Sequence, residues 1–153
     1  MDKKTLSEQD ICSKYVLPAI IDAGWDLQTQ VREQVTFTAG RIKIFGKSVT
    51  RGEKKRADFI LYYKNHLPLA IIEAKDNNHT PGAGLEQAKD YARSLDIPFV
   101  YSTNGDEFIE FDFLKGTETS MQINEIPSPS ELFRRYLESK GYNDEQKEIV
   151  LQD

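Results

Sequence analysis

Apolar residues recur at helical spacing near the start of the chain. Residues 6–23 carry apolar stripes three and four positions apart, which predicts a helix over this segment. Thr5 and Glu8 have the spacing of a capping box at its start, and Gly24 is a suitable stop at its end. Pro18 lies inside the segment and should kink or divide the helix, because proline has no backbone N–H to donate.

Strand-like patterns occupy the next part of the chain. Residues 27–37 alternate loosely, which predicts a strand with one face formed by Leu27, Thr29, Val31, Glu33, Val35 and Phe37. Residues 39–55 are basic and punctuated by glycine, so they predict a long loop or an extended hairpin. Residues 57–63 and 69–74 are apolar on both faces and rich in β-branched or aromatic side chains, which is typical of central, buried strands. Residues 64–68 supply the turn between them.

The second half of the chain alternates between helix and strand. Residues 85–95 predict a helix whose core stripe is Leu85, Ala88, Ala92 and Leu95. Residues 98–102 and 107–113 predict two further strands, and Ser130 is placed to cap a last helix over residues 131–139. The order of elements predicts an α/β fold, with a central mixed β-sheet flanked by helices.

Composition favours one ordinary globular domain. A chain of 153 residues that is 39% hydrophobic can bury a core of its own. No apolar run approaches the ~20 residues of a membrane span, and the start lacks a signal peptide, so we expect a cytoplasmic protein with no membrane contact. We assign residues 1–140 to the domain. Residues 141–153 are charged and helix-prone with little that would pack, and we interpret them as the start of a linker.

Positive charge is concentrated in one segment although the net charge of the chain is −5. Residues 41–56 hold seven cations and a single acid, Glu53, which gives a local net charge of +6. Such local charge is what neutralises phosphates in non-specific DNA binding. A solvated loop without a ligand would have the same composition. The candidate DNA-binding residues are Arg41, Lys43, Lys47, Arg51, Lys54, Lys55 and Arg56.

Two acidic residues interrupt the two apolar strands. If the turn is centred between Asn65 and His66, antiparallel pairing places Asp58 directly opposite Glu73. Two like charges in that position destabilise a sheet, and an apolar environment increases the cost. Lys75 lies two residues after Glu73 and points to the same face. The pattern therefore predicts a cluster of two carboxylates and one ammonium group at the end of a buried hairpin.

This cluster has two interpretations. Oxygen ligands favour Mg²⁺, with Mn²⁺ as a substitute, and the expected ligands are Asp58, Glu73 and the Ala74 carbonyl. A bound metal would assist phosphodiester hydrolysis, and Lys75 would orient the attacking water or offset developing charge. A buried salt bridge between the acids and Lys75 would also explain the cluster, and spacing alone leaves both readings open.

Longer motifs resemble a known nuclease family. Ala57-Asp58 followed by Ile71-Ile72-Glu73-Ala74-Lys75 resembles the PD-(D/E)xK motif, with alanine in place of the proline. Gln87 and Tyr91 resemble the QxxxY motif of one branch of that superfamily. Over roughly residues 6–135, the ordered set is similar to the N-terminal endonuclease domain of the R subunit of type I restriction enzymes. That set also includes Glu8, Gly24-Trp25, the basic segment and Tyr101-Ser102-Thr103-Asn104-Gly105.

The resemblance implies roles for individual residues. It implies a restriction-endonuclease-like core in which Asp58, Glu73 and Lys75 are catalytic. Gln87 and Tyr91 would brace the site or contact DNA, although the edge of an amphipathic helix is the alternative reading. Glu8 would complete the site from the first helix, and a capping role with Thr5 is the alternative.

The resemblance also implies the substrate and the partners. The expected substrate is double-stranded DNA, cut without sequence recognition by this domain, while modification and specificity subunits select the site. The linker would lead to an ATP-driven motor. We expect no ATP site in this chain, because Gly40 is one residue too far from Gly46-Lys47-Ser48 for a P-loop. Two alternatives remain: a stand-alone repair or junction-resolving nuclease, and a nuclease-like DNA-binding or docking module without activity.

Overall fold

The computed structural model describes residues 2–38, 43–45, 48–50, 54–141 and 144–151, and only the backbone at 43–45, 48–50, 144 and 147. In chain order the helical elements are η1 (Lys3–Thr5), α1 (Glu8–Ile11), η2 (Cys12–Val16), α2 (Leu17–Asp22), α3 (Leu85–Leu95), η3 (Ile123–Glu125), α4 (Pro129–Lys140) and α5 (Asp144–Leu151). The strands are β1 (Val31–Thr38), β2 (Lys43–Phe45), β3 (Ser48–Thr50), β4 (Lys54–Lys64), β5 (Leu67–Ala74), β6 (Phe99–Thr103), β7 (Glu107–Asp112) and β8 (Thr117–Gln122).

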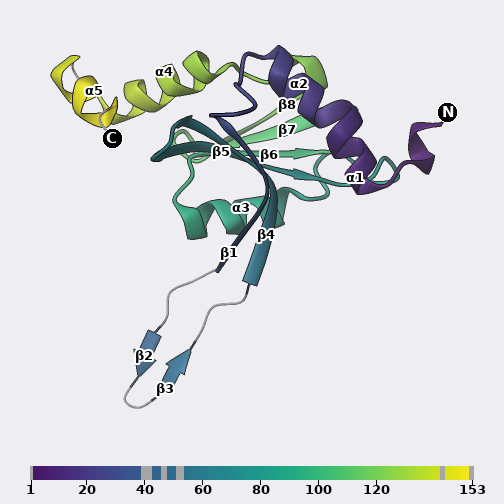
Figure 1. Cartoon of the computed structure of the whole chain (residues 1–153), viewed down its shortest axis with the longest axis horizontal. Coiled ribbons are helices and arrows are strands. Elements are labelled where there is room, and N and C mark those ends of the chain that lie inside the picture. Colours follow the sequence, from purple (N-terminus) through teal and green to yellow (C-terminus); the bar gives the residue numbers. More distant parts are fainter. Residues whose placement is uncertain (1, 39–42, 46–47, 51–53, 142–143, 152–153) are drawn as a thin grey trace.

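One mixed sheet of six strands forms the centre of the molecule (Figure 1). Its order is β1-β4-β5-β6-β7-β8, and β2 and β3 pair separately as a small hairpin. Neighbouring strands are antiparallel except β5 and β6, which are parallel and joined through α3. The predicted fold class is confirmed, and β4 and β5 each have a strand on both sides.

Helices cover both faces of the sheet, and each face has its own apolar cluster (Figure 1). The first cluster lies between the sheet and the N-terminal and α4 helices, and includes Trp25, Phe59, Ile72 and Leu132. The second lies between the sheet and α3, and includes Ile60, Ile71, Ala88 and Val100. None of the described helices is long and apolar enough to cross a membrane.

The N-terminal helical segment differs from the prediction at its start. The capping box is formed by Ser7 and Asp10, whose side chains accept hydrogen bonds from each other's backbone N–H. The predicted pairing of Thr5 with Glu8 is therefore wrong, and the Thr5 hydroxyl instead donates to the Asp2 carbonyl. Pro18 divides the segment as expected. The π-helical turn η2 ends just before it, and Pro18 lies in the first turn of α2.

The first strand is shorter and less regular than predicted. It starts at Val31, because the Asp26 carboxylate accepts the N–H groups of residues 28 and 29 and holds them in a turn. The predicted single face is also wrong. Val31 belongs to the cluster under the N-terminal helices, whereas Val35 and Phe37 pack against the α3-side cluster. The change occurs at Gln34, whose φ of +52° is in the left-handed region.

Three elements near the C-terminus also depart from the sequence pattern. β8 was not predicted, because its residues are mostly exposed and polar and its order comes from pairing with β7. Ser128, and not Ser130, caps α4: its hydroxyl accepts the Glu131 N–H, with Pro129 in the first turn where its fixed φ suits a helix. Val150 and Leu151 of α5 pack against the first cluster, although the sequence of this segment offers little that would pack.

Candidate active site

The β4–β5 hairpin has the predicted register next to the acidic residues. Phe59 pairs with Ile72 and Ile60 pairs with Ile71, which is the pairing expected from a turn centred between Asn65 and His66. The register shifts around Tyr62, nearer the turn, and is restored at its end. Continued by one residue beyond Phe59, this register places Asp58 opposite Glu73.

The carboxylate of Asp58 is hydrogen bonded on both sides. Its Oδ2 accepts the backbone N–H of Ala74 on β5 at 2.8 Å. Its Oδ1 accepts the Nε2 amide of Gln34 on β1 at 3.4 Å. Because β1 and β5 flank β4, the half-buried side chain is held between its two neighbouring strands.

Glu73 is the most perturbed acid in the site. Its side chain is almost fully buried, and desolvation together with the Asp58 charge and a side-chain hydrogen bond to Asp58 raises its pKa to about 9. A backbone hydrogen bond from Asp58 and the charge of Lys75 act in the opposite direction but are weaker. Oε1 of Glu73 is a buried side-chain oxygen without any hydrogen-bond partner in the described structure. Such an atom is costly unless a ligand satisfies it.

The donor set fits a hard divalent cation. No group of three or more His, Cys, Asp and Glu side chains in the described part of the chain is arranged to hold a metal ion. Mg²⁺ needs fewer protein ligands, because it keeps several waters and binds through one or two carboxylates. Asp58 and Glu73, with the unpartnered Oε1 of Glu73, meet that requirement.

The N-terminal end of α3 packs against the end of β5 that carries Glu73. Gly84 precedes the helix, and a methyl group there would lie 3.3 Å from Ser102 Oγ, 3.5 Å from Glu73 Cβ and 3.6 Å from Lys75 Cε. Ser102 Oγ accepts the Gly84 N–H and donates to the Pro81 carbonyl, which holds the preceding loop. The half-buried Lys75 side chain therefore passes beside a glycine backbone. Gly84 has no distinguishing signal in the sequence, because its closeness to β5 depends on the fold.

The QxxxY residues contact each other and β1. The Gln87 amide donates to the Tyr91 hydroxyl at 2.5 Å, and the Tyr91 ring meets Phe37 edge-on with centroids 5.2 Å apart. Lys55 Nζ lies 5.9 Å from the centroid of the Tyr91 ring. The pair thus links α3 to the strands that carry Gln34 and Asp58.

Glu8 is exposed at the first position of α1. It acts electrostatically on Cys12, a buried thiol whose pKa is raised to about 12 by desolvation and then by the charges of Asp58, Glu8 and Glu73. Cys12 therefore lies within electrostatic range of Asp58, Glu8 and Glu73.

Comparison with known proteins identifies the family. Residues 29–127 match the family described as "Type I restriction enzyme R protein N terminus (HSDR_N)". The chain belongs to this family. It is 42% identical over 157 aligned residues to the type I restriction enzyme EcoAI endonuclease subunit of Escherichia coli, an alignment that covers 100% of this chain and 19% of the relative. The chain thus spans about a fifth of the length of that relative.

A solved structure supports the same relationship. It is a fragment of a protein from Vibrio vulnificus YJ016 described as an HsdR subunit of a type I restriction enzyme. The two share 45% sequence identity with a TM-score of 0.78, and the match covers 92% of this chain and 27% of the other. The R-protein N-terminal fold is therefore shown over nearly the whole chain.

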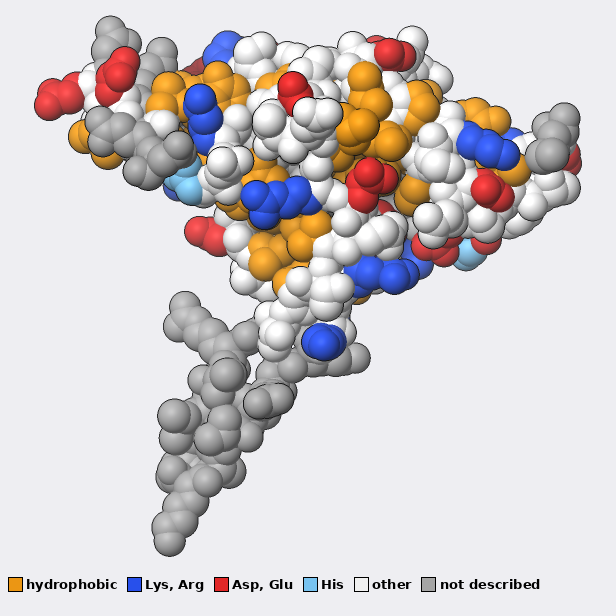
Figure 2. Space-filling view, viewed as in Figure 1, with side chains coloured by type: hydrophobic (Ala, Val, Ile, Leu, Met, Phe, Trp, Pro, Cys, Tyr) orange, Lys and Arg blue, Asp and Glu red, His pale blue; other side chains and the backbone are white. Residues whose placement is uncertain are grey.

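The basic residues of this family member are only partly described. Lys54 and Arg56 are exposed on β4 and Lys55 is half-buried, within four residues of Asp58. Arg41, Lys47 and Arg51 lie outside the described residues, and Lys43 is described by its backbone alone. On the face seen in Figure 2, the Lys and Arg side chains of the described residues are dispersed among acidic and apolar ones.

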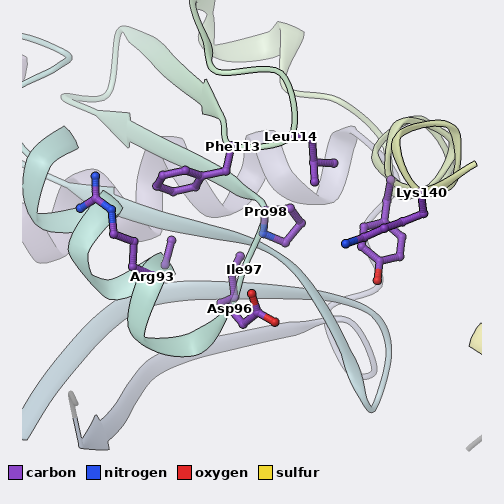
Figure 3. A pocket seen from close by; sticks show the side chains of 9 residues that line it. Arg93, Asp96, Ile97, Pro98, Phe113, Leu114 and Lys140 are labelled. Carbon is purple, nitrogen blue, oxygen red and sulfur yellow. The ribbon is translucent and has the colours of Figure 1, made fainter. Parts of the chain in front are cut away.

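A separate pocket lies at the other end of α3. It has a volume of about 350 Å³ and includes Arg93, Asp96, Phe113 and Lys140 (Figure 3). These residues come from the end of α3, from the segment after β7 and from α4, whereas Gly84 and Glu73 lie at the start of α3 and the end of β5. The pocket shares no residue with the predicted site.

Proposed function

We propose that this chain is the DNA-cleaving part of a type I restriction enzyme R subunit, a Mg²⁺-dependent endonuclease domain that hydrolyses phosphodiester bonds of double-stranded DNA. Membership of the R-protein N-terminal family supports this assignment. The observation that carries it is the half-buried Asp58 beside the buried Glu73, with a Glu73 oxygen that has no hydrogen-bond partner in the described structure.

Asp58, Glu73 and the Ala74 carbonyl would hold the metal, and Mn²⁺ would substitute for Mg²⁺. When bound, the metal supplies charge neutralisation at the scissile phosphate and makes water a stronger acid. The chain's own contribution is a pair of oxygen ligands held in place at a strand end. Glu73 has to release its proton on binding, because its raised pKa keeps it protonated at neutral pH in the metal-free chain.

Lys75 has a distinct role beside the two acids. It follows Glu73 by two positions, and the Cε of Lys75 and the Cβ of Glu73 both lie beside Gly84. There it would orient the attacking water and offset negative charge that develops on the phosphate oxygens. Gln87 and Tyr91 would support the β1–β4 side of the site, and Glu8 would support it from α1.

The basic residues would position DNA against this site. Arg56 precedes Asp58 by two residues, roughly 7 Å along a strand. Lys54 and Lys55 extend the same strand, and Arg41, Lys43, Lys47 and Arg51 would continue the contact. Phosphate contacts carry no sequence information, so modification and specificity subunits of the assembly would select the site in the cytoplasm. ATP hydrolysis is assigned to other parts of the R subunit.

Metal binding tests the proposal directly. Isothermal titration of the chain with Mn²⁺ should show uptake that is abolished by Glu73→Gln and by Asp58→Asn. Glu118→Gln on the exposed strand β8 is the matched control and should bind as the parent does. In parallel, the parent subunit within its complex should cut plasmid DNA with Mg²⁺ and the Glu73→Gln variant should not. Equal Mn²⁺ binding by the parent chain and Glu73→Gln would refute the proposal.

A further inference from the structure

The pairing of β1 with β4 is interrupted at one position. Glu33 pairs with Phe59 and Val35 pairs with Ala57, so the register is the same on both sides of the interruption. Gln34 should therefore stand opposite Asp58, yet this pair is missing from the ladder. Gln34 has a φ of +52°, a conformation that is uncommon for residues other than glycine.

The apolar side chains of both strands change from one face of the sheet to the other at this position. On β1, Val31 belongs to the cluster under the N-terminal helices, whereas Val35 packs with the α3-side cluster. On β4, Phe59 belongs to the former and Ala57 to the latter. Residues separated by an even number of positions share a face in a regular strand. The two strands therefore rotate together about their long axes, and this local rotation is centred on Gln34 and Asp58.

The rotation brings the Gln34 side chain to Asp58. Its Nε2 amide donates to Asp58 Oδ1 at 3.4 Å, while the Ala74 N–H holds Oδ2 from the other side. Gln34 is half-buried, so this contact is partly shielded from water. Strained backbone conformations of this kind persist where the surroundings over-determine them, and they cluster at functional sites.

We propose that Gln34 is a positioning residue of the metal site, which orients the Asp58 carboxylate through its amide. This inference rests on the proposed function and adds a residue outside the motifs found in the sequence. Donors behind a carboxylate ligand fix its orientation, and their removal typically weakens metal affinity about 10- to 100-fold. Gln34 itself does not touch the metal or the substrate in this proposal.

Two substitutions separate the amide from the backbone conformation. Gln34→Met removes the amide with little change in side-chain length and leaves the left-handed backbone requirement in place. Gln34→Gly removes the amide and also relieves that requirement, because glycine adopts positive φ freely. Gln122→Met, on the exposed strand β8, is the control for replacement of a strand glutamine.

The test is Mn²⁺ affinity of the chain, measured by isothermal titration at constant pH. We expect both Gln34 variants to bind Mn²⁺ about 10-fold more weakly than the parent, and Gln122→Met to bind equally. Unchanged affinity in either Gln34 variant, with the parent binding normally, would overturn the role of the amide and leave the proposed function standing. If the parent chain takes up no Mn²⁺, both proposals fail.

A second measurement detects the contact between the Gln34 amide and Asp58 directly. In a ¹⁵N–¹H spectrum, the side-chain amide signals of Gln34 are identified by their absence from the Gln34→Met spectrum. They should shift when Mg²⁺ is added to the parent, because the carboxylate to which they donate gains a cation. Signals of Gln122 should stay in place. A Gln34 amide that is insensitive to saturating Mg²⁺ would contradict the proposal, and a merely structural amide would behave in that way.

Discussion

Asp58 accepts the backbone N–H of Ala74 through its side chain, with an Oδ2 to N distance of 2.8 Å. The regular ladder between β4 and β5 ends one residue earlier, at Phe59 and Ile72. A side chain thus takes the place of a backbone acceptor where the hairpin reaches the site. This contact fixes Asp58 next to Glu73, and it allows the charge of Asp58 to be separated experimentally from its hydrogen bond.

Replacement of Asp58 by asparagine should stabilise the metal-free chain. Asparagine keeps an oxygen that can accept the Ala74 N–H, but it removes a charge beside Glu73. The charge of Asp58 is one cause of the raised pKa of Glu73, so its removal should lower that pKa and with it the cost of keeping Glu73 protonated at pH 8. We expect the free energy of unfolding to rise by about 1.4 kcal/mol for each unit by which the pKa of Glu73 falls. Urea denaturation in EDTA measures it, with Glu118→Gln as the control. A clear decrease would mean that the charge of Asp58 stabilises the fold.

The stability of the metal-free chain should fall as the pH rises from about 4.5 to about 9. The pKa of Glu73 is raised from 4.5 to about 9 by burial and by Asp58, so in this window the folded chain holds a proton that the unfolded chain has released. Each rise of one pH unit within this window therefore lowers the free energy of unfolding. Glu73→Gln should flatten this dependence, and saturating Mg²⁺ should also reduce it, because the metal binds the ionised carboxylate. Parallel pH profiles for the parent and Glu73→Gln would exclude this assignment.

Lys75→Ala should abolish DNA cleavage while the chain still binds Mn²⁺ and stays folded. The side chain is half-buried and passes beside Gly84. Its truncation to alanine should therefore allow water to reach and solvate the two acids. If Lys75 were instead a required structural partner of the buried acids, its loss would cost roughly 3–5 kcal/mol. Thermal melting with Mn²⁺ titration separates the two cases. A variant that cuts DNA at the parental rate would exclude the catalytic role.

Gly84→Ala should impair the site with a modest loss of stability. The added methyl group would come within 3.3 Å of Ser102 Oγ, so Ser102 would have to move and weaken its hydrogen bonds to Gly84 and Pro81. One such bond contributes about 1 kcal/mol, which is the loss expected in urea denaturation. Gly82→Ala is the control, because its methyl group would make an ordinary 3.6 Å contact with Ile109. Equal cleavage and stability for both variants would mean that the start of α3 does not have to pack closely on β5.

Replacement of Lys54, Lys55 and Arg56 by alanine should weaken DNA binding and make it less sensitive to salt. Each phosphate contact that is removed should lower the slope of log K against log salt by about 0.9. The control carries the same change in net charge at the exposed residues Lys14, Lys115 and Lys140. Binding is measured by fluorescence anisotropy on duplex DNA at several salt concentrations. Equal slopes for the two triple variants would show that the start of β4 does not contact phosphate.

The local elements that carry the motif can be predicted from the residues of each segment alone. The helix over residues 85–95 has the same bounds in the structure, because its apolar stripe has an unambiguous period. The register that opposes Asp58 and Glu73 follows from a short turn and two apolar strands, which are contacts between residues close in the chain. The family could likewise be recognised from the order and spacing of its motifs.

The way in which those residues are held depends on contacts between distant segments of the chain. The pKa of Glu73 depends on burial beneath neighbouring strands and α3, and Gly84 meets Ser102 only because α3 returns the chain to pair β6 with β5. β8 exists as a strand because β7 offers it a partner. Gln34 turns toward Asp58 through a backbone conformation for which glutamine has no intrinsic preference. Each of these features is fixed by contacts between segments distant in sequence, and residue types along one segment do not encode such contacts.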